Sequence, residues 1–138
     1  MGGDTQEDVT GSSEEVSEDV VDVPQDQLIA IGDFENVMYE TTGHAEVWLL
    51  ANGSYELRFS DDFSTTGMLP APSVAMSVDP EIGPTLIAED GDLDLGGLPT
   101  VTGAQSFALP FAPGPREYAW VWCKPFGIEV ARAHLVAP

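Results

Sequence analysis

The sequence predicts an all-β fold: a single antiparallel β-sandwich or flattened barrel over residues 28–138, behind a disordered acidic tether over residues 1–27. From residue 28 onward, short segments with alternating apolar residues are separated by turn signals, a pattern typical of sandwiches and barrels. No stretch indicates a strong helix. Residues 1–27 hold nine acids, no Lys or Arg and no aromatic residue. They bury too little apolar area to offset the entropy of ordering.

The sequence of the first half of the domain predicts three strands joined by tight turns. They are expected over residues 31–38, 44–50 and 54–60. Between the second and third strands lies Asn52-Gly53. Both residues tolerate positive φ, so this pair predicts a β-hairpin. Alternation then places Tyr55, Leu57 and Phe59 inward, and Glu56 and Arg58 outward.

The second half begins with a long loop, and long loops in small domains are often functional. The loop covers residues 61–72, and an acidic, Gly-rich stretch covers 79–97. Further strands are expected over residues 73–78, 105–110, 118–123, 126–130 and 133–136. In the strand over 118–123, alternation places Tyr118, Trp120 and Trp122 on one face and Cys123 on the other. Pro125, which has no N–H for a sheet ladder, must end this strand.

Charge and cysteine content exclude several classes of function. The chain has 24 Asp and Glu against 4 Lys and Arg, a net charge of −20. Such a surface repels phosphate backbones and anionic membranes, so a nucleic-acid partner is not expected. No membrane-spanning run and no signal peptide are visible in the sequence. A single cysteine rules out an internal disulfide and a zinc site of the CxxC type.

Cys123 is the main candidate functional residue, and two interpretations of it are open. A free cysteine is among the most buried residue types, so Cys123 fits a structural core thiol. It also fits a redox thiol or an axial metal or haem ligand. His44 and His134, the only histidines, are candidate second ligands, and Met68 is a candidate thioether ligand. Nothing in the spacing of these residues supports a shared site.

Other chemistry has little support in the sequence. The acidic run over residues 89–94 resembles a calcium loop in composition. It lacks the ligand spacing and the closing bidentate Glu of an EF-hand, so a solvated turn is the better interpretation. The chain has no GxSxG, P-loop or GxGxxG motif, so hydrolase and nucleotide-enzyme functions have no signal.

A series of short motifs, taken in their order along the chain, resembles the DM-thirteen domain. The motifs are Gly32-Asp-Phe34, His44-Ala-Glu-Val47, Asn52-Gly53, Leu57-Arg-Phe59, Asp62-Phe63, Leu93-Asp-Leu-Gly96, Gly103-Ala-Gln-Ser-Phe-Ala-Leu-Pro110, Val121-Trp-Cys123, Phe126 and Ala133-His-Leu135. The likeness covers nearly all of the expected domain, and the order of the pieces carries it more than any one piece. The DM-thirteen domain is the all-β module of Skeletor-type surface proteins, often found beside DOMON and membrane cytochrome b domains.

The resemblance implies extracytoplasmic electron transfer or oxidative modification of surface proteins. Cys123 matches the family's near-invariant cysteine, which is held to be a redox centre, either as a bare thiol or as ligand of a prosthetic group such as haem. His44 corresponds to the histidine of an early His-x-x-x-Gly region whose Gly is absent here. The chain also departs from the family over residues 67–74, where members usually carry a Gly-Pro-Asp-Leu-like motif. If that loop lines the site, the ligand or partner would differ from that of the family.

Two classes of function therefore stay open, and both describe a module more than a stand-alone enzyme. The first is an extracytoplasmic redox or electron-transfer module, tethered at the cell surface. Cys123 would be its centre, near Trp120 and Trp122, with a redox partner or another surface protein as its partner. The second is a non-catalytic binding or adhesion module with a buried structural cysteine. An acidic tether commonly follows the anchored cysteine of bacterial surface lipoproteins, so we expect a lipid anchor upstream of Met1.

Overall fold

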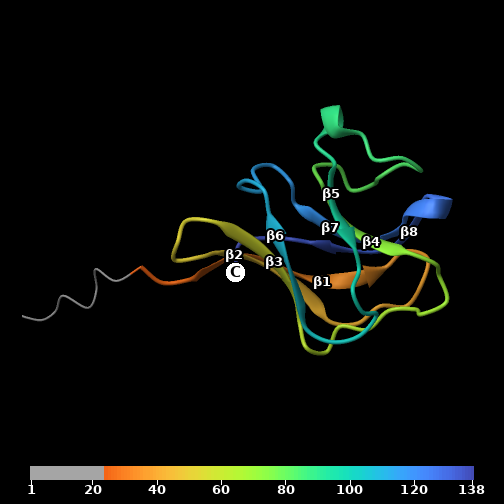
Figure 1. Ribbon diagram of the computed structural model, residues 1–138, viewed down its shortest axis with the longest axis horizontal. Helices are drawn as coiled ribbons and strands as arrows, with labels where there is room; N and C mark the ends of the chain where they lie inside the picture. The colour runs from red at the N-terminus through yellow and green to blue at the C-terminus, as the bar shows by residue number, and fades with distance from the viewer. Residues whose placement is uncertain (1–23) are drawn as a thin grey trace, which may run out of the picture.

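The computed structural model describes residues 24–138 and consists of one antiparallel sheet of eight strands (Figure 1). The strands are β1 (Gln27–Asn36), β2 (His44–Leu49), β3 (Tyr55–Phe59), β4 (Pro72–Ser77), β5 (Leu93–Gly97), β6 (Gln105–Leu109), β7 (Tyr118–Cys123) and β8 (Ile128–His134). Two short 3-10 turns, η2 (Ala88–Asp90) and η3 (Lys124–Phe126), join them. The expected all-β class is confirmed.

The sheet curls into a flattened, nearly closed barrel. Its strand order is β5-β4-β7-β8-β1-β2-β3-β6. Strand β1 joins the two halves, because its first part pairs with β2 and its last residues pair with β8. The two edge strands, β5 and β6, come close to each other without pairing. This curling gives the sheet an inner face, which can form a core, and an outer face.

The hairpin between β2 and β3 forms as the sequence predicts. Gly53 has φ of +90°, a conformation that glycine adopts without steric cost. The N–H of Leu50 donates to the carbonyl oxygen of Ser54 at 2.8 Å and closes the turn. Leu57 and Phe59 point inward and are buried, as alternation requires. The paired residues run in register from Ala45 opposite Phe59 to Leu49 opposite Tyr55.

Two details of the expected element boundaries are corrected. The domain begins before residue 28, because Gln27 already pairs in β1 and Asp26 accepts a hydrogen bond from the N–H of Ala51 at 2.8 Å. The rest of the expected tether, residues 1–23, lies outside the described residues. The last two expected strands are one strand, β8, which pairs along β7 with a shift in register between Val121 and Trp122. The break expected at residues 131–132 does not occur.

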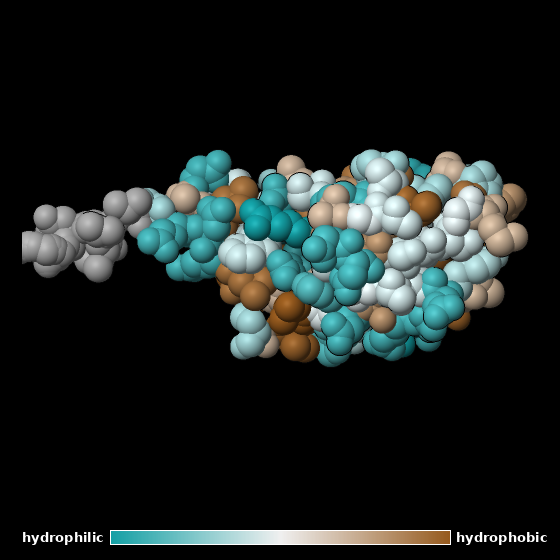
Figure 2. Space-filling model, turned by 90° about the horizontal axis from the view of Figure 1, so that it is seen from below, coloured by the Kyte–Doolittle hydropathy of each residue, from teal (hydrophilic) through white to brown (hydrophobic). Residues whose placement is uncertain are grey.

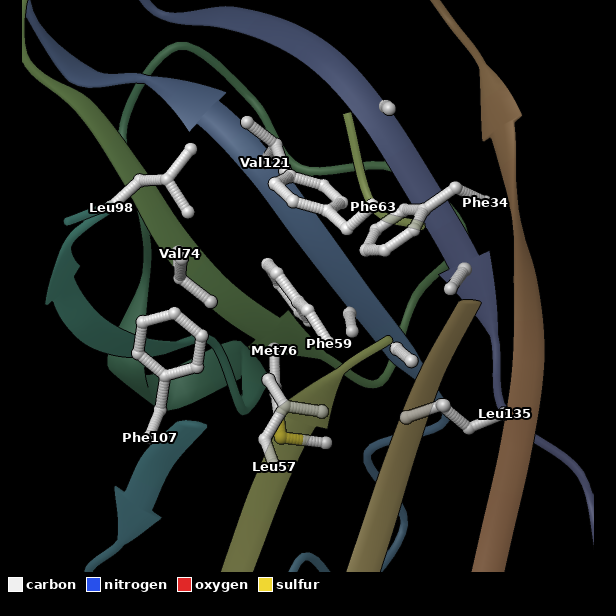
Figure 3. Packing of buried hydrophobic residues seen from close by; sticks show 14 of the residues in the cluster. Phe34, Leu57, Phe59, Phe63, Val74, Met76, Leu98, Phe107, Val121 and Leu135 are labelled. Atoms are coloured by element: carbon white, nitrogen blue, oxygen red, sulfur yellow. The ribbon is translucent and has the colours of Figure 1, made fainter. Parts of the chain in front are cut away.

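The main core fills the interior of the barrel (Figure 3). Side chains of β3 and β6 point toward those of β4 and β7, so that Phe59 and Phe107 face Val74 and Val121. Phe59 lies at the centre of an aromatic group, with its ring centroid 5.0 Å from that of Phe34, 4.8 Å from Phe63 and 5.1 Å from Phe107. The inward alternation of the strands therefore produces one continuous apolar core.

A second, smaller core lies on the outer face of the sheet, over β4 and β7. Residues 78–92, here called the cover segment, leave the end of β4, cross this face and return as β5; they are green in Figure 1. Ile82 of the cover segment packs with Ala75, Trp120 and Trp122 of the sheet. Both faces of β7 are consequently buried. The sequence separates the two faces of this strand correctly, and the structure adds what covers the aromatic one.

Side chains of β4, β7 and β8, more than backbone pairing, hold the cover segment in place. Glu129 accepts a hydrogen bond from the N–H of Ile82 at 2.6 Å, and Arg132 donates to the carbonyl oxygen of Pro80. The hydroxyl of Ser77 donates to the carbonyl oxygen of Asp79 at 2.7 Å. Gly127, at φ +61°, allows close approach, since a Cβ there would lie 2.7 Å from the Cα of Pro84.

One face of the molecule is largely polar. Figure 2 shows a face that is mostly hydrophilic, with a small group of hydrophobic residues near the end where residue 24 lies. Such a face is expected of an antiparallel sheet that is solvated on one side. Within residues 24–138, no helix has the length and apolar content needed to cross a membrane.

Candidate functional site

Cys123 is the last residue of β7 and points into the main core. It lies opposite Pro72 of β4 and Ile128 of β8, and its exposed fraction is 0%. Its Sγ donates a hydrogen bond to the carbonyl oxygen of Pro70 at 3.4 Å. The thiol is therefore packed among apolar side chains, and its one weak donor is satisfied.

This environment does not fit a haem ligand. A cysteine that ligates haem iron must present its sulfur to an open pocket large enough for the macrocycle. Cys123 instead belongs to the packed interior, and none of the four principal cavities in the described part of the chain is lined by it. Ligation would require the main core to open.

His134 lies far from Cys123. It is opposite Tyr118 in the pairing of β7 with β8, five residues along β7 from the cysteine. This spacing corresponds to about 16 Å along the strand. The imidazole stacks on the ring of Tyr118 with centroids 4.7 Å apart, and its Nε2 lies 2.9 Å from a carboxylate oxygen of Glu117. It therefore lies on the outer face, whereas the thiol lies inside.

His44 is also separate from the cysteine. It begins β2, three strands away from β7 in the sheet order. Its Nε2 lies 2.8 Å from Oε2 of Glu46, whose other oxygen accepts a hydrogen bond from the indole of Trp48 at 2.7 Å. Partial burial raises the pKa of Glu46, but the hydrogen bonds from Trp48 and His44 and the charge of Arg58 lower this pKa by more. The net pKa lies below its usual value, so the arrangement is a surface charge network.

The remaining candidate ligands also lie apart. Met68 is 85% exposed in the loop before β4, so its thioether is not directed at the thiol. In the acidic run over residues 89–94, Asp92 accepts a hydrogen bond from the N–H of Ile87 at 2.8 Å, which makes this run a turn. Residues 24–138 contain no group of three or more His, Cys, Asp or Glu arranged to hold a metal ion. The structure thus brings none of the predicted ligands together.

The backbone that covers the thiol has one unusual conformation. Ala71 has φ of +48° and is the single non-glycine residue with positive φ in the described part of the chain. It lies between Pro70, which accepts the hydrogen bond of Cys123, and Pro72, which pairs with it. Positive φ in a non-glycine residue stores backbone strain, and strain of this kind is concentrated at functional sites.

The largest cavity lies between the cover segment and the outer face of the sheet. Its volume is about 620 Å³. Its apolar wall includes Leu86, Leu93 and Trp122, and its charged residues are Asp92, Asp94 and Lys124. The volume and the mixture of an apolar wall with a few polar groups are those of small-molecule sites. Sequence reasoning missed this cavity, because no motif in the stretch over residues 79–97 indicates a binding site and its place on the sheet follows from the tertiary structure.

One of the residues that line this cavity, Trp122, carries a buried polar group without a partner. The indole N–H groups of Trp48 and Trp120 donate to Glu46 and to the hydroxyl of Ser77, each at 2.7 Å. Trp122 is 2% exposed, and its Nε1 has no hydrogen-bond partner. A buried donor without an acceptor costs free energy, and such groups are rare in native proteins.

An ion pair lies beside the cavity. The Nζ of Lys124 donates to Oδ2 of Asp94 at 2.7 Å. This hydrogen bond lowers the pKa of Asp94, burial partly opposes it, and the N–H of Gly96 and the charge of Lys124 lower the pKa further. The net pKa lies below its usual value, so Asp94 is ionised and paired at neutral pH. Arg116 and Arg132 bind the cover segment, so three of the chain's four basic residues lie around this region.

Comparisons with known protein families, curated proteins and solved structures find no match to this chain. The resemblance to the DM-thirteen domain therefore stays a prediction that rests on the order of the sequence motifs.

Proposed function

We propose that the chain is a non-catalytic binding module, carried outside the cytoplasm at the cell surface, with Cys123 as a structural core thiol. The single observation that carries this choice is the complete burial of Cys123 in the main core. Reactive cysteines lie in partly exposed, electropositive surroundings, because the thiolate is the reacting form. Cys123 has neither feature: its neighbours in the core are apolar and its exposed fraction is 0%.

The separation of the candidate ligands supports the same choice. A redox centre built on Cys123 would need a second ligand, a resolving thiol or a path for electrons to the surface. The chain has one cysteine, and both histidines are paired with glutamates away from it. Trp120 and Trp122 lie on the opposite face of β7, where they form the second core. They are packing residues in this arrangement.

A redox module is the second candidate function, and the strained Ala71 favours it. Ala71, Pro70 and Pro72 together lie over the thiol. If the loop over residues 60–71 opened, the thiol would become accessible. It could then act as the redox centre that the family resemblance implies. The partner would then be an extracytoplasmic redox protein or another surface protein.

Replacement of Cys123 by alanine and by serine measures what the buried thiol contributes to stability. We expect Cys123→Ala to fold and to lose about 1 kcal/mol of stability, the typical cost of a single substitution. Cys123→Ser should lose more, about 1–3 kcal/mol, because a buried hydroxyl is more costly to leave imperfectly paired. The measurement is urea unfolding followed by circular dichroism.

Visible spectra of the same variants test the redox function directly. A binding module predicts that added haemin gives the same spectrum with the original protein and with Cys123→Ala. A haem band that shifts when Cys123 is replaced would establish ligation and overturn the proposed function.

A further inference from the structure

We propose that the cavity beneath the cover segment binds a neutral, mainly apolar small molecule whose carbonyl or ether oxygen accepts a hydrogen bond from the indole of Trp122. This inference rests on the proposed binding function and names its site and the class of its ligand. It uses no property of Cys123.

The cavity is a hollow that opens to the surface, because most of the residues that line it are exposed. The cavity lies between the second core and the charged pair Asp94–Lys124. Its volume of about 620 Å³ is large enough for a small cyclic molecule. Leu86 and Trp122 form part of its wall, and both belong to the second core or pack against it. The second core thus supplies part of the apolar wall of the cavity.

The unpaired indole indicates which polar group the ligand must bring. The indole N–H groups of Trp48 and Trp120 each have an acceptor, whereas that of Trp122 is buried and has none. A ligand oxygen would satisfy the third. The Nε1 atom is shielded from solvent, so its acceptor must enter with a small shift of the cover segment. The segment can shift in this way because side-chain contacts, such as that of the Glu129 carboxylate with the N–H of Ile82, hold it without sheet pairing.

The charges around the cavity exclude the two ionic classes of ligand. An ammonium ligand offers only donors, so it cannot satisfy an N–H group. An anionic ligand would need a free cation, but Lys124 already pairs with Asp94 at 2.7 Å. Asp92 adds a further negative charge to the wall. A neutral ring with one acceptor is the class that remains.

The indole N–H signals of the three tryptophans provide the test. In ¹⁵N-labelled protein, each Trp gives one resolved indole signal, which Trp→Phe variants assign. Coumarin and 4-chromanone, two neutral bicyclic compounds with a carbonyl acceptor, are the probes. We expect either probe to shift the Trp122 indole signal downfield in a saturable manner, while those of Trp48 and Trp120 stay in place. Unlabelled indole, which has a donor and no comparable acceptor, should bind more weakly by roughly two- to tenfold, as expected for one hydrogen bond.

A matched pair of variants locates the binding. Leu86 lines the cavity, whereas its neighbour Ile87 is 46% exposed and does not line it. Leu86→Gln should weaken binding by at least roughly fivefold, since it removes apolar contact area. Ile87→Gln should leave binding unchanged.

Three results would overturn the assignment: no shift of the Trp122 signal at the solubility limit of both probes, equal shifts of all three indoles, or unchanged binding by Leu86→Gln. None of these results bears on Cys123. The spectra with haemin and the reactivity of the Cys123 thiol in the folded protein test the proposed function separately.

Discussion

Phe59→Ala is expected to lower the free energy of unfolding by about 3–5 kcal/mol, the range for removal of a fully buried aromatic side chain. Phe59 is 2% exposed. Its ring contacts those of Phe34, Phe63 and Phe107, which come from β1, the loop after β3, and β6. Because these segments lie far apart in the sequence, the cavity left by alanine would loosen the barrel as a whole. Urea unfolding followed by far-ultraviolet circular dichroism measures the change.

Phe126→Ala is the matched control for this prediction. Phe126 is the same residue type, but it is 62% exposed in η3. Surface substitutions usually change stability by less than about 0.5 kcal/mol, so this variant should unfold close to the original midpoint. Equal losses in Phe59→Ala and Phe126→Ala would contradict the placement of the main core.

Trp120→Ala is expected to cost a similar amount, about 3–5 kcal/mol, and to free the cover segment. Trp120 is fully buried between the sheet and Ile82, and its indole donates to Ser77 at 2.7 Å. That hydroxyl in turn donates to Asp79, the second residue of the cover segment. Loss of the indole should therefore raise amide hydrogen exchange across residues 78–92 while β2 and β3 stay protected.

Trp48→Ala serves as the comparison for the second core. Trp48 is half-buried on β2, where it contacts Arg58 and Glu46 at the surface. Its removal should cost less than Trp120→Ala and should leave exchange in the cover segment unchanged. If Trp120→Ala left this exchange unchanged as well, the cover segment would not depend on the second core.

Much of the fold can be predicted from local sequence signals. The hairpin at Asn52-Gly53 and the alternation in β2, β3 and β7 are nearest-neighbour effects, since turn chemistry and period-2 patterning act within a few residues. The sequence predicts two strands over residues 126–130 and 133–136, and Arg132 falls in the expected gap between them. In the structure, the guanidinium of Arg132 donates to the carbonyl oxygen of Pro80 over the outer face, so the charge does not interrupt the strand.

The candidate site depends more on long-range structure. Alternation assigns Cys123 and Trp122 to opposite faces of β7, but it cannot tell which face is interior or that residues 78–92 cover the other. The unpaired Nε1 of Trp122 has no sequence signal, because Trp120 and Trp122 look equivalent in the strand and only Trp120 finds an acceptor, in Ser77. Likewise, the separation of His44 from Cys123 follows from strand order, and that of His134 follows from the register in which β8 pairs with β7.

Alkylation of Cys123 in the folded protein tests the central claim most directly. Iodoacetamide is added across a series of urea concentrations, and the modified fraction is followed by mass spectrometry. If Cys123 is a structural thiol in the main core, only the unfolded protein reacts. The rate of modification without urea should then be lower than that of a free thiol by a factor equal to the folding equilibrium constant. This rate should rise together with global unfolding. Rapid modification without urea, at a rate close to that of a free thiol, would contradict it. Such a result would mean that the loop over residues 60–71 opens and that the thiol is available for chemistry.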